Sequence, residues 1–318
     1  MENIAVKVIQ KMTEAKDIVS FELASADGAP LASFSAGSHI DVHIPGGLTR
    51  QYSLCNDATE QHRYRIAVLR DEASRGGSVA MHDQVHAGDV LHISSPKNHF
   101  PLQHAARTLL FAGGIGVTPL LCMAQRLAAI GADFNLHYCT RSVERTAFQQ
   151  EISDSVFADR VQFHYDAGPP DQKLNLEVAL GNPETEKQLY VCGPVGFIDY
   201  VVATAKSKGY KSEQIHVEYF GAAVLDPSGD VGFEIKIAST GQTYNIGADE
   251  NIVQVLKSHG IEILTSCEQG VCGTCITRVL DGQPDHRDMY FTDEERIKND
   301  QFTPCCSRSI SKTLVLDL

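Results

Sequence analysis

The sequence has 318 residues, of which 43 % are apolar, enough to build the cores of two or three domains. A mainly disordered chain is therefore excluded. The 27 basic and 40 acidic residues give a net charge of −13, which argues against a protein that follows nucleic-acid phosphates with a basic surface. We expect a folded protein of several domains that binds no nucleic acid, and the composition leaves room for small anionic ligands at local basic sites.

The cysteines and the apolar stretches indicate the compartment. Residues 1–17 alternate charged and apolar positions, so no secretory signal is expected. The uncharged stretch 108–125 is broken by glycines and a proline, which favours a strand, a turn and a helix over a membrane span. Nine cysteines, four of them in a metal-like pattern, are typical of a reducing compartment. We expect a cytoplasmic protein with no membrane contact.

Changes in periodicity divide the chain into three domains. Short β-rich runs separated by turn residues predict an antiparallel β-barrel over 1–101. Apolar strands then alternate with helical stretches over 102–222, which predicts a parallel α/β domain. Residues 223–230 combine Pro, Gly, Ser and Asp and are typical of a linker. The last domain, 231–318, carries strands, a helix and a cysteine-rich loop.

Three cysteines in one loop and a fourth near the C-terminus follow the plant-type [2Fe–2S] spacing C-x4-C-x2-C…C. Gly270 and Gly273 permit sharp turns in this loop and let backbone amides point at the sulfurs. A structural zinc site or buried free cysteines are the alternatives, although zinc loops usually pair two short cysteine elements. The expected metal ligands are Cys267, Cys272, Cys275 and Cys305.

Cys306 competes with Cys305 for the fourth position. Adjacent side chains in an extended segment point to opposite faces, so only one of the two can face the cluster. We expect Cys305 to be the ligand and Cys306 to be a packing residue.

The loop SCEQGVCGTC, the segment DHRDMYFTDEE and the ending CCSRS resemble the C-terminal ferredoxin domain of the phthalate dioxygenase reductase family. The resemblance covers nearly the whole chain, in the order flavin, nicotinamide, cluster. It implies a flavin-binding barrel, a nucleotide-binding α/β domain and a β-grasp-like [2Fe–2S] ferredoxin domain. It is strongest to the reductase components of bacterial Rieske oxygenases.

The tetrapeptide RQYS resembles the R-x-Y-S signature of the ferredoxin-NADP reductase superfamily. The resemblance implies that Arg50 meets the flavin phosphate, Tyr52 packs against the isoalloxazine and Ser53 lies near the reactive N5 atom. A guanidinium pairs a phosphate bidentately and a tyrosine supplies a flat face, so the residue types suit these roles. Taken alone, the tetrapeptide also fits an exposed strand arginine and a core tyrosine.

A second element, RGGS, precedes a short helical stretch, VAMHDQV, that Ser78 could cap. Arg75, Gly76 and Gly77 would leave unpaired amides before the helix, which suit a phosphate. In the resembling reductases this element holds the phosphate of FMN, so FMN is expected rather than FAD. An ordinary glycine turn is the alternative.

The run FAGGIGVTP joins a strand to a helix and matches the element with which the superfamily binds NAD(P)H. Its glycines, Gly113, Gly114 and Gly116, allow close backbone approach. Thr118 and the amides of the helix that begins near Pro119 offer donors to a pyrophosphate. The spacing departs from G-x-G-x-x-G, and a merely structural turn is the alternative.

Two later segments complete the expected hydride-transfer site. The resemblance places Cys192 and Gly193, in the CGP element, beside the nicotinamide; a buried strand cysteine is the alternative, and no base marks Cys192 as a nucleophile. The resemblance also implies an aromatic that stacks on the flavin; Phe220 is the candidate, and it must move or share its place when the nicotinamide approaches. Ser53, Cys192 and Phe220 are thus the candidates nearest to the reacting atoms.

The choice of nicotinamide depends on charge near the ribose. Arg141 and Arg145 follow a predicted strand and could accept a 2′-phosphate or simply be solvated. The resembling reductases mostly use NADH, and we expect NADH here.

Together these elements predict an electron circuit. The resemblance implies that NADH delivers a hydride to FMN, that single electrons pass to the [2Fe–2S] cluster, and that a Rieske-type oxygenase acting on an aromatic acid receives them. It also implies a monomer. The alternatives are a flavin and iron–sulfur carrier or redox-sensing subunit that does not oxidise NADH, and a zinc-stabilised flavoprotein oxidase. Five acidic residues could form a face that steers a basic partner or an ordinary solvated surface: Asp285, Asp288, Asp293, Glu294 and Glu295.

Overall fold

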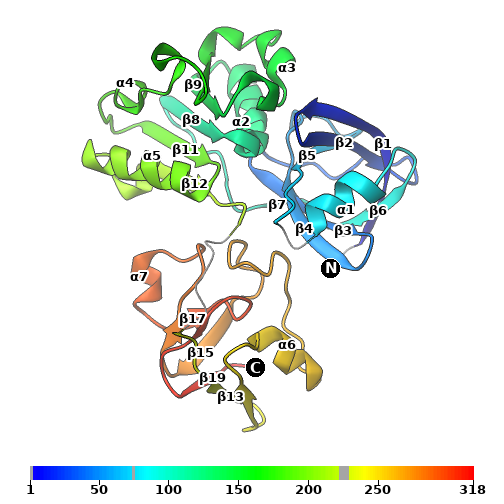
Figure 1. The fold of residues 1–318 in the computed structure, drawn as a ribbon, viewed down its shortest axis with the longest axis vertical. Coiled ribbons are helices and arrows are strands. Elements are labelled where there is room, and N and C mark those ends of the chain that lie inside the picture. Colours follow the sequence, from blue (N-terminus) through cyan, green and yellow to red (C-terminus); the bar gives the residue numbers. More distant parts are fainter. Residues whose placement is uncertain (1–2, 74–75, 222–228) are drawn as a thin grey trace. The chain divides into compact units, whose positions relative to one another are not determined.

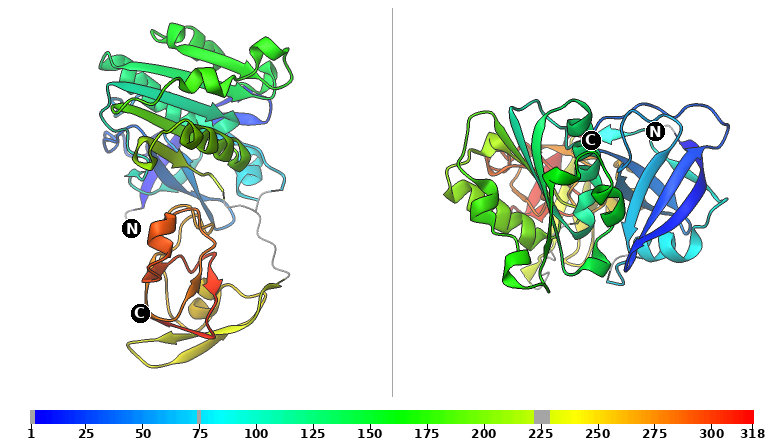
Figure 2. Two further views of the ribbon diagram at one scale, coloured as in Figure 1. Left: turned by 90° about the vertical axis from the view of Figure 1, so that its left-hand side faces the viewer. Right: turned by 90° about the horizontal axis from the view of Figure 1, so that it is seen from above.

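The computed structural model describes residues 3–73, 76–221 and 229–318. It divides the chain into two compact units, Met1–Phe220 (unit one) and Gly221–Leu318 (unit two). Unit one holds two sheets, and unit two holds a five-stranded sheet and a separate strand pair; the ribbon views show the two units (Figures 1 and 2). Most of the predicted linker 223–230 lies outside the described residues.

The first half of unit one is a seven-stranded antiparallel sheet in the order β4-β3-β6-β1-β2-β5, with β7 paired to β3. Its inward side chains form one apolar core. The edge strands meet just beyond β4, where the amide of Cys55 donates to the carbonyl of Arg65 at 2.9 Å, so the sheet curls toward the predicted barrel. The elements are β1 Ile4–Ala15, β2 Ile18–Ser25, β3 Ser38–Ile44, β4 Leu48–Ser53, β5 Tyr64–Leu69, α1 Gly77–Gln84, β6 Val90–Ile93 and β7 Lys97–Asn98.

The second half of unit one is a parallel sheet in the order β10-β9-β8-β11-β12, as predicted for an α/β domain. Helix α2 covers one face and α4 and α5 cover the other, so the central strands are buried on both sides. The strands are β8 Arg107–Gly113, β9 Asp133–Thr140, β10 Val161–Tyr165, β11 Lys187–Cys192 and β12 Ile215–Glu218. The α-helices are α2 Val117–Ala129, α3 Gln149–Ser153, α4 Leu176–Leu180 and α5 Val195–Ser207. The 3-10 helices are η1 Gly114–Gly116, η2 Val143–Arg145, η3 Ala158–Arg160, η4 Pro170–Gln172 and η5 Ser212–Gln214.

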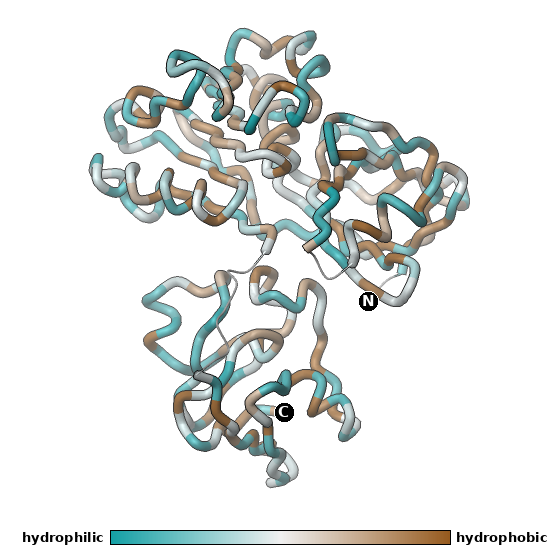
Figure 3. Tube along the Cα trace, viewed as in Figure 1, coloured by the Kyte–Doolittle hydropathy of each residue, from teal (hydrophilic) through white to brown (hydrophobic). Residues whose placement is uncertain are grey.

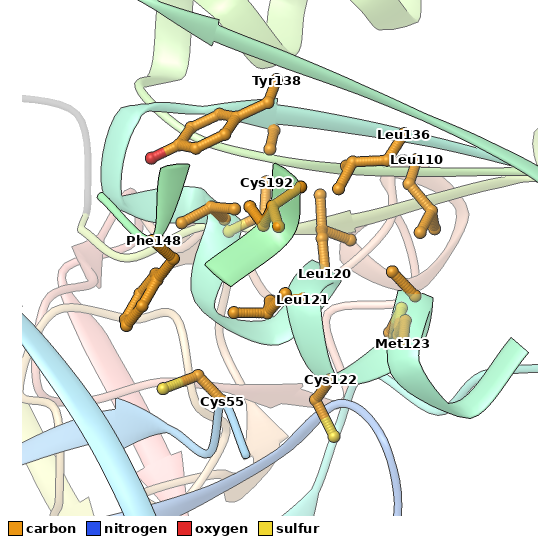
Figure 4. Close-up of a cluster of buried hydrophobic side chains, with 14 of the residues drawn as sticks. Cys55, Leu110, Leu120, Leu121, Cys122, Met123, Leu136, Tyr138, Phe148 and Cys192 are labelled. Atoms are coloured by element: carbon orange, nitrogen blue, oxygen red, sulfur yellow. The ribbon is translucent and has the colours of Figure 1, made fainter. Parts of the chain in front are cut away.

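The two halves of unit one share a core. Cys122 of α2 and Cys55 of the barrel belong to the same buried cluster (Figure 4). Beside this cluster the guanidinium of Arg65 forms two hydrogen bonds of 2.7 Å with the carboxylate of Glu151. The same guanidinium lies 4.9 Å from the centre of the Phe148 ring. Apolar packing and a partly buried ion pair therefore hold the barrel to the α/β half.

Unit two contains a five-stranded sheet in the order β14-β13-β19-β15-β17 and a separate pair, β16 with β18. Apolar side chains of the sheet pack on helix α6. Hydrophobic residues recur along the strands of both units, with hydrophilic residues between them (Figure 3). The elements are β13 Phe233–Ile237, β14 Thr243–Ile246, α6 Ile252–Ser258, β15 Thr277–Asp281, β16 Pro284–Asp285, α7 Asp293–Arg296, β17 Gln301–Phe302, β18 Arg308–Ser309 and β19 Thr313–Leu316. Among the helices of the described ranges, none has the length and apolarity needed to cross a bilayer.

Two glycines of the barrel share the same backbone conformation but not the same surroundings. Gly37 has φ of 91° and Gly46 has φ of 92°. A Cβ at position 37 would lie 1.9 Å from the carbonyl oxygen of Phe100, whereas a Cβ at position 46 would meet nothing within 4 Å. We expect Gly46→Ala to cost about 1–2 kcal/mol through the left-handed backbone alone. Gly37→Ala should cost roughly 1–3 kcal/mol more through overpacking.

Thermal unfolding of the two variants measures this difference. A domain of the size of unit one loses about 2–4 °C of Tm per kcal/mol, so Gly37→Ala should unfold clearly below Gly46→Ala. Equal midpoints would contradict the close approach of the two backbones.

Candidate functional site

The two predicted flavin-phosphate motifs come together in unit one. A Cβ on Gly77, the first residue of α1, would lie 2.7 Å from Nε of Arg50 in β4. Gly76 precedes the helix with φ of 82°, a conformation that favours glycine. The Arg50 side chain thus lies against the start of a helix whose first amides have no partner within the helix, an arrangement that suits a phosphate. Arg75 lies outside the described residues.

The predicted cap of this helix is wrong. Gly76 is the N-cap, no side chain caps the helix, and Ser78 lies in its first turn. The Ser78 hydroxyl instead donates to the carbonyl of Asp71 at 3.2 Å and accepts from the amide of Asp71 at 3.1 Å. The helix begins two residues earlier than expected, at Gly77 and not at Val79, because Gly77 already has helical geometry, and the Ser78 side chain holds the preceding loop against it.

Tyr52 and Ser53 end β4 and point to opposite faces of the sheet, as neighbouring strand residues do. Tyr52 lies opposite Ile40 in the register of β3 and packs against the barrel core, and burial raises the pKa of its phenol. Ser53 is buried, and its hydroxyl donates to Oε2 of Glu218 at 3.3 Å. The barrel thereby contacts the end of β12 in the α/β half.

Glu218 is a site residue that the sequence reasoning missed. Its enclosed carboxyl has little solvation, which raises the pKa to about 8 although the Ser53 hydroxyl acts in the opposite direction. Cys192 lies opposite Glu218 in the register of β11 and β12, and burial, followed by the Glu218 charge, raises the pKa of the Cys192 thiol. Cys192 is therefore a neutral thiol, in line with the expectation that it is not a nucleophile. The available signal was the position of Glu218 at the end of a predicted strand, two residues before Phe220.

Phe220 follows this strand at the end of unit one. The residue is 40 % exposed, although burial of a phenylalanine side chain would stabilise the fold by about 1.5–3 kcal/mol. An exposed ring two residues beyond Glu218 is suited to cover a flat ligand.

The loops after β8 and β11 meet where the strand order of the parallel sheet reverses, the usual place for a nucleotide in such sheets. A Cβ on Gly116 would lie 2.2 Å from the carbonyl oxygen of Cys192, and one on Gly193 would lie 2.9 Å from Cα of Gly113. Glycine is therefore required at these three positions by the packing of one loop on the other. Gly114 differs, because it has φ of 55° and a Cβ there would meet nothing within 4 Å.

Thr118 and Pro119 begin α2 and are both buried. The Thr118 hydroxyl donates to the carbonyl of Ile115 at 3.0 Å, so it stabilises its own loop. Its donation to a pyrophosphate stays a prediction. The amide of Val117 already donates to the carbonyls of Gly114 and Ile115, and Pro119 has no N–H, so the candidate backbone donors are the amides of η1 that precede α2.

The two arginines considered for a 2′-phosphate have different surroundings. Arg145 forms an ion pair of 3.1 Å with Asp17 of the barrel. Arg141 is exposed directly after β9. The amide of Asp166 donates to the carbonyl of Thr140 at 3.0 Å, which places Asp166 beside Arg141 at the end of β10. Asp166 is exposed, and the sequence reasoning did not consider it.

The four predicted cluster cysteines are buried in unit two and lie in two pairs. The thiol of Cys267 interacts with that of Cys272, and the thiol of Cys275 with that of Cys305. Within the described ranges no three His, Cys, Asp or Glu side chains gather closely enough to hold a single metal ion. Two iron atoms that share two sulfides each need two thiolates, so the pairwise arrangement fits a [2Fe–2S] cluster.

The backbone of the cysteine loop matches the expectation for its glycines. Gly270 and Gly273 have φ of 71° and 69°. The amide of Gln269 points at Sγ of Cys267 at 3.3 Å, and the amide of Thr274 lies 3.5 Å from Sγ of Cys272. Such amides stabilise thiolate ligands.

A second loop lies over both glycines. A Cβ on Gly270 would be 2.9 Å from Cα of Asp288, and one on Gly273 would be 2.5 Å from the Tyr290 ring. The Asp288 carboxylate accepts hydrogen bonds from the amides of Tyr290, at 3.0 Å, and Phe291, at 2.8 Å. Asp288 therefore acts inside the protein and cannot belong to an acidic surface.

Two more carboxylates of the predicted acidic face have partners within the protein. Asp285 accepts from Nε of Arg287 at 2.7 Å. The Glu295 side chain accepts from the amide of Thr292 at 2.9 Å in a capping box. Asp293 and Glu294 remain exposed in the first turn of α7, although Oδ1 of Asp293 lies 3.5 Å from Nη1 of Arg296 in an exposed ion pair.

Comparisons with known proteins bear on the iron–sulfur region and on the chain as a whole. A family model described as a 2Fe-2S iron-sulfur cluster binding domain matches residues 235–309, which include the four cysteines. The chain is similar to vanillate O-demethylase oxidoreductase of Pseudomonas putida, at 54 % identity over 98 % of both chains. It is 39 % identical to phthalate dioxygenase reductase of Burkholderia cepacia over 99 % of this chain and 97 % of that one. A solved phthalate dioxygenase reductase, described as a modular structure for electron transfer from pyridine nucleotides to [2Fe-2S], covers 99 % of this chain and 98 % of its own with a TM-score of 0.79 and 38 % identity. The predicted fold class is thus confirmed.

The raised pKa of Glu218 predicts how stability changes with pH. The folded protein keeps the Glu218 proton up to pH about 8, whereas an unfolded chain releases it near the ordinary value of 4.5. Folding therefore loses stability from this group as pH rises from about 4.5 through about 8. Glu218→Gln removes this titrating group, so the Tm of the variant minus that of the wild type should increase as pH rises over this interval.

Thermal unfolding between pH 4.5 and 9 measures the difference in Tm. Glu213→Gln, at an exposed position, should follow the wild type at every pH and serves as the control. Parallel curves for wild type and Glu218→Gln would contradict the enclosed carboxyl.

Proposed function

Since the chain belongs to the phthalate dioxygenase reductase family, we propose that it takes hydride from NADH onto FMN and passes single electrons through its [2Fe–2S] cluster to a Rieske-type oxygenase. It is the reductase component of an aromatic oxygenase or demethylase, and it carries electrons from NAD(P)H through a flavin to a 2Fe-2S cluster. When bound, the flavin accepts electrons in pairs and releases them singly, which lets a two-electron donor serve a one-electron acceptor. The single observation that carries the finer proposal is the convergence of Ser53, Cys192 and Glu218 where the barrel meets the nucleotide-binding loops.

Contact between Arg50 and the start of α1 supports FMN. Arg50, Gly76 and Gly77 would hold one terminal phosphate through a guanidinium and helix amides. Tyr52 would pack against the flavin ring and Phe220 would cover it. A contribution of Arg75 to phosphate binding rests on the family resemblance alone.

Ser53 and Glu218 would handle the proton of the flavin. Near neutral pH the Glu218 carboxyl is largely protonated, and its Oε2 atom lies 3.3 Å from the Ser53 hydroxyl. The pair can therefore hold or exchange a proton at Oγ of Ser53, the atom that the family resemblance places near N5. The neutral Cys192 thiol would pack beside the nicotinamide and exclude water.

The nicotinamide would enter between the loops after β8 and β11. Gly114 leaves open space for the pyrophosphate, while Gly113, Gly116 and Gly193 keep the loops together. Asp166 supports NADH over NADPH, because a carboxylate near the ribose hydrogen-bonds a 2′-hydroxyl and repels a 2′-phosphate. Arg141 beside it would offset part of this repulsion.

The electron acceptor and the setting follow from the family. A relative at 54 % identity is named for vanillate O-demethylation, so we propose a partner oxygenase that acts on vanillate or a similar methoxylated aromatic acid. The partner's Rieske centre would receive electrons from the cluster held by Cys267, Cys272, Cys275 and Cys305. None of the nine cysteines, all of which lie in the described ranges, forms a disulfide, in keeping with a reducing cytoplasm, and we propose that the reductase works there as a monomer.

Anaerobic addition of NADH to the purified protein tests the circuit. We expect both the flavin and the iron–sulfur absorption bands to bleach, because electrons pass from one group to the other. Absence of bleaching would leave only a carrier that does not oxidise NADH, and a yellow protein without iron would indicate an oxidase. The flavin released from the protein should co-elute with FMN, and release of FAD would refute that part of the proposal.

The preference for NADH should depend on Asp166. Asp166→Asn removes a negative charge whose repulsion of a phosphate at the protein surface is on the order of 1–4 kcal/mol. We therefore expect the ratio of kcat/KM for NADPH to that for NADH to rise about fivefold or more. Steady-state kinetics with both nucleotides measure it. Asp171→Asn, at an exposed position in η4, is the matched control, and an unchanged ratio in Asp166→Asn would exclude Asp166 from the ribose site.

A further inference from the structure

Two adjacent thiols in unit two compete for one ligand position. Cys305 is buried and Cys306 is half-buried, and their thiols contact each other. The segment is not extended, contrary to the sequence-based argument. The amides of Cys306 and Ser307 both donate to the carbonyl of Thr303, at 3.2 and 3.0 Å, so residues 303–307 form a turn. Strand alternation therefore does not separate the two thiols, and other contacts must decide which of them binds iron.

Asn251 holds Cys305 from one side. Its Nδ2 donates to the carbonyl oxygen of Cys305 at 2.6 Å. Its Oδ1 accepts from the amides of Val253 and Gln254, at 2.9 and 3.3 Å, and so caps α6. The helix that starts there presents Val253, which packs against Cys275 and Cys305. One side chain thus fixes both the peptide after Cys305 and the helix against which the Cys305 side chain rests.

Cys306 is held on a different side of the turn. Its Sγ lies 3.3 Å from the hydroxyl of Thr303 and 3.8 Å from the hydroxyl of Ser307. A Cβ on Gly270 would lie only 2.3 Å from the same sulfur. The Cys306 thiol therefore fills the space beside the ligand loop and is engaged by two hydroxyls.

The residue after the turn is fixed to the same segment as Cys305. Nη1 of Arg308 donates to the carbonyl of Glu250 at 3.0 Å, and Nη2 donates to the carbonyl of Gly247 at 2.9 Å. Nη2 also donates to the carbonyl of Val231 at 3.0 Å. Together with the Asn251 contact, these hydrogen bonds attach both ends of the 305–308 segment to residues 247–251. The main movement left to the segment is rotation of the peptide between Cys305 and Cys306, and the Asn251 side-chain amide restricts that rotation.

We propose that Asn251 is a positioning residue that selects Cys305 over Cys306 as the fourth thiolate of the [2Fe–2S] cluster, while Thr303 holds the Cys306 thiol aside. The hydrogen bond to the Cys305 carbonyl sets the peptide plane between the two cysteines, and this plane sets the direction in which each side chain leaves the backbone. Without the amide donor the turn can rotate and present either thiol. The inference rests on the proposed ligand set.

Asn251→Asp tests the selection without removing the helix cap. An aspartate keeps the oxygen that caps α6 but replaces the N–H donor by an oxygen that repels the Cys305 carbonyl. In the full-length, cluster-loaded protein reduced with dithionite, we expect wild type to give one EPR signal and Asn251→Asp to give two. The second signal should disappear when Cys306→Ala is added. Asn245→Asp, an exposed change of the same chemistry in β14, should keep the wild-type signal.

The single cysteine variants separate this inference from the ligand set. Cys305→Ala should lower acid-labile sulfide and iron–sulfur absorption at least tenfold, and Cys306→Ala should leave both unchanged. If Cys305→Ala keeps a full cluster, the proposed ligand set is wrong. If Cys305→Ala loses the cluster but Asn251→Asp shows only the wild-type signal, the ligand set stands and the selection by Asn251 is refuted. A third outcome would also refute the selection. If Asn251→Asp loses the cluster and adding Cys306→Ala changes nothing, Asn251 stabilises the fold around the cluster and does not choose between the two cysteines.

Discussion

Unit one depends on the close contact between the backbone of the loop after β8 and that of the loop after β11, at the carboxyl ends of these two central strands. Where Gly116 meets the carbonyl of Cys192, no side chain can intervene. This contact brings the ends of β8 and β11 together, and the register of β11 with β12 then places Glu218 beside Cys192. Because Glu218 reaches Ser53 of the barrel, one steric requirement aligns the nucleotide loops with the flavin side of the molecule.

Unit two meets a different requirement, which is to present four sulfurs in two pairs. Positive φ angles at Gly270 and Gly273 turn three cysteines inward from a single loop. The fourth arrives from a turn that a helix cap and Arg308 fasten in place. The glycines allow the ligand loop to adopt the left-handed backbone conformations that it needs. The contacts around Cys305 hold the fourth cysteine in one position, and a rigid cluster site needs both features.

Local patterns in the sequence were sufficient for the sheets and for most of the motifs. The β-rich runs, the uncharged strand before Gly113 and the cysteine spacing each have a period or spacing that a single segment contains. Contacts between distant segments were not visible. The ion pair of Arg145 with Asp17 and the hydrogen bond of Ser53 with Glu218 join residues from different halves of unit one, so no local pattern could predict them.

The wrong predictions have local causes of another kind. Ser78 is a good N-cap residue, but Gly77 can enter the helix first, and propensity alone does not decide between the two starts. Cys305 and Cys306 were treated as strand residues, although Thr303 accepts two amides and closes a turn. Asp285 and Asp288 were counted as surface charges because a sequence does not show which carboxylates find partners inside the fold.

The seam between the barrel and α2 has a consequence for the speed of nucleotide exchange. Cys55 and Cys122 lie in one continuous core, and Arg65 with Glu151 adds a bidentate pair beside it. Opening this contact as a hinge would expose that core, so we propose that the two halves admit and release the nicotinamide without separating. Under this proposal the moving group is the exposed Phe220 ring, and side-chain rotation of this kind takes picoseconds to nanoseconds, against microseconds to milliseconds for a hinge. Ring motion of this kind is too fast to limit turnover, so this proposal predicts a slow step in hydride transfer, in release of the oxidised nucleotide or in electron transfer to the partner.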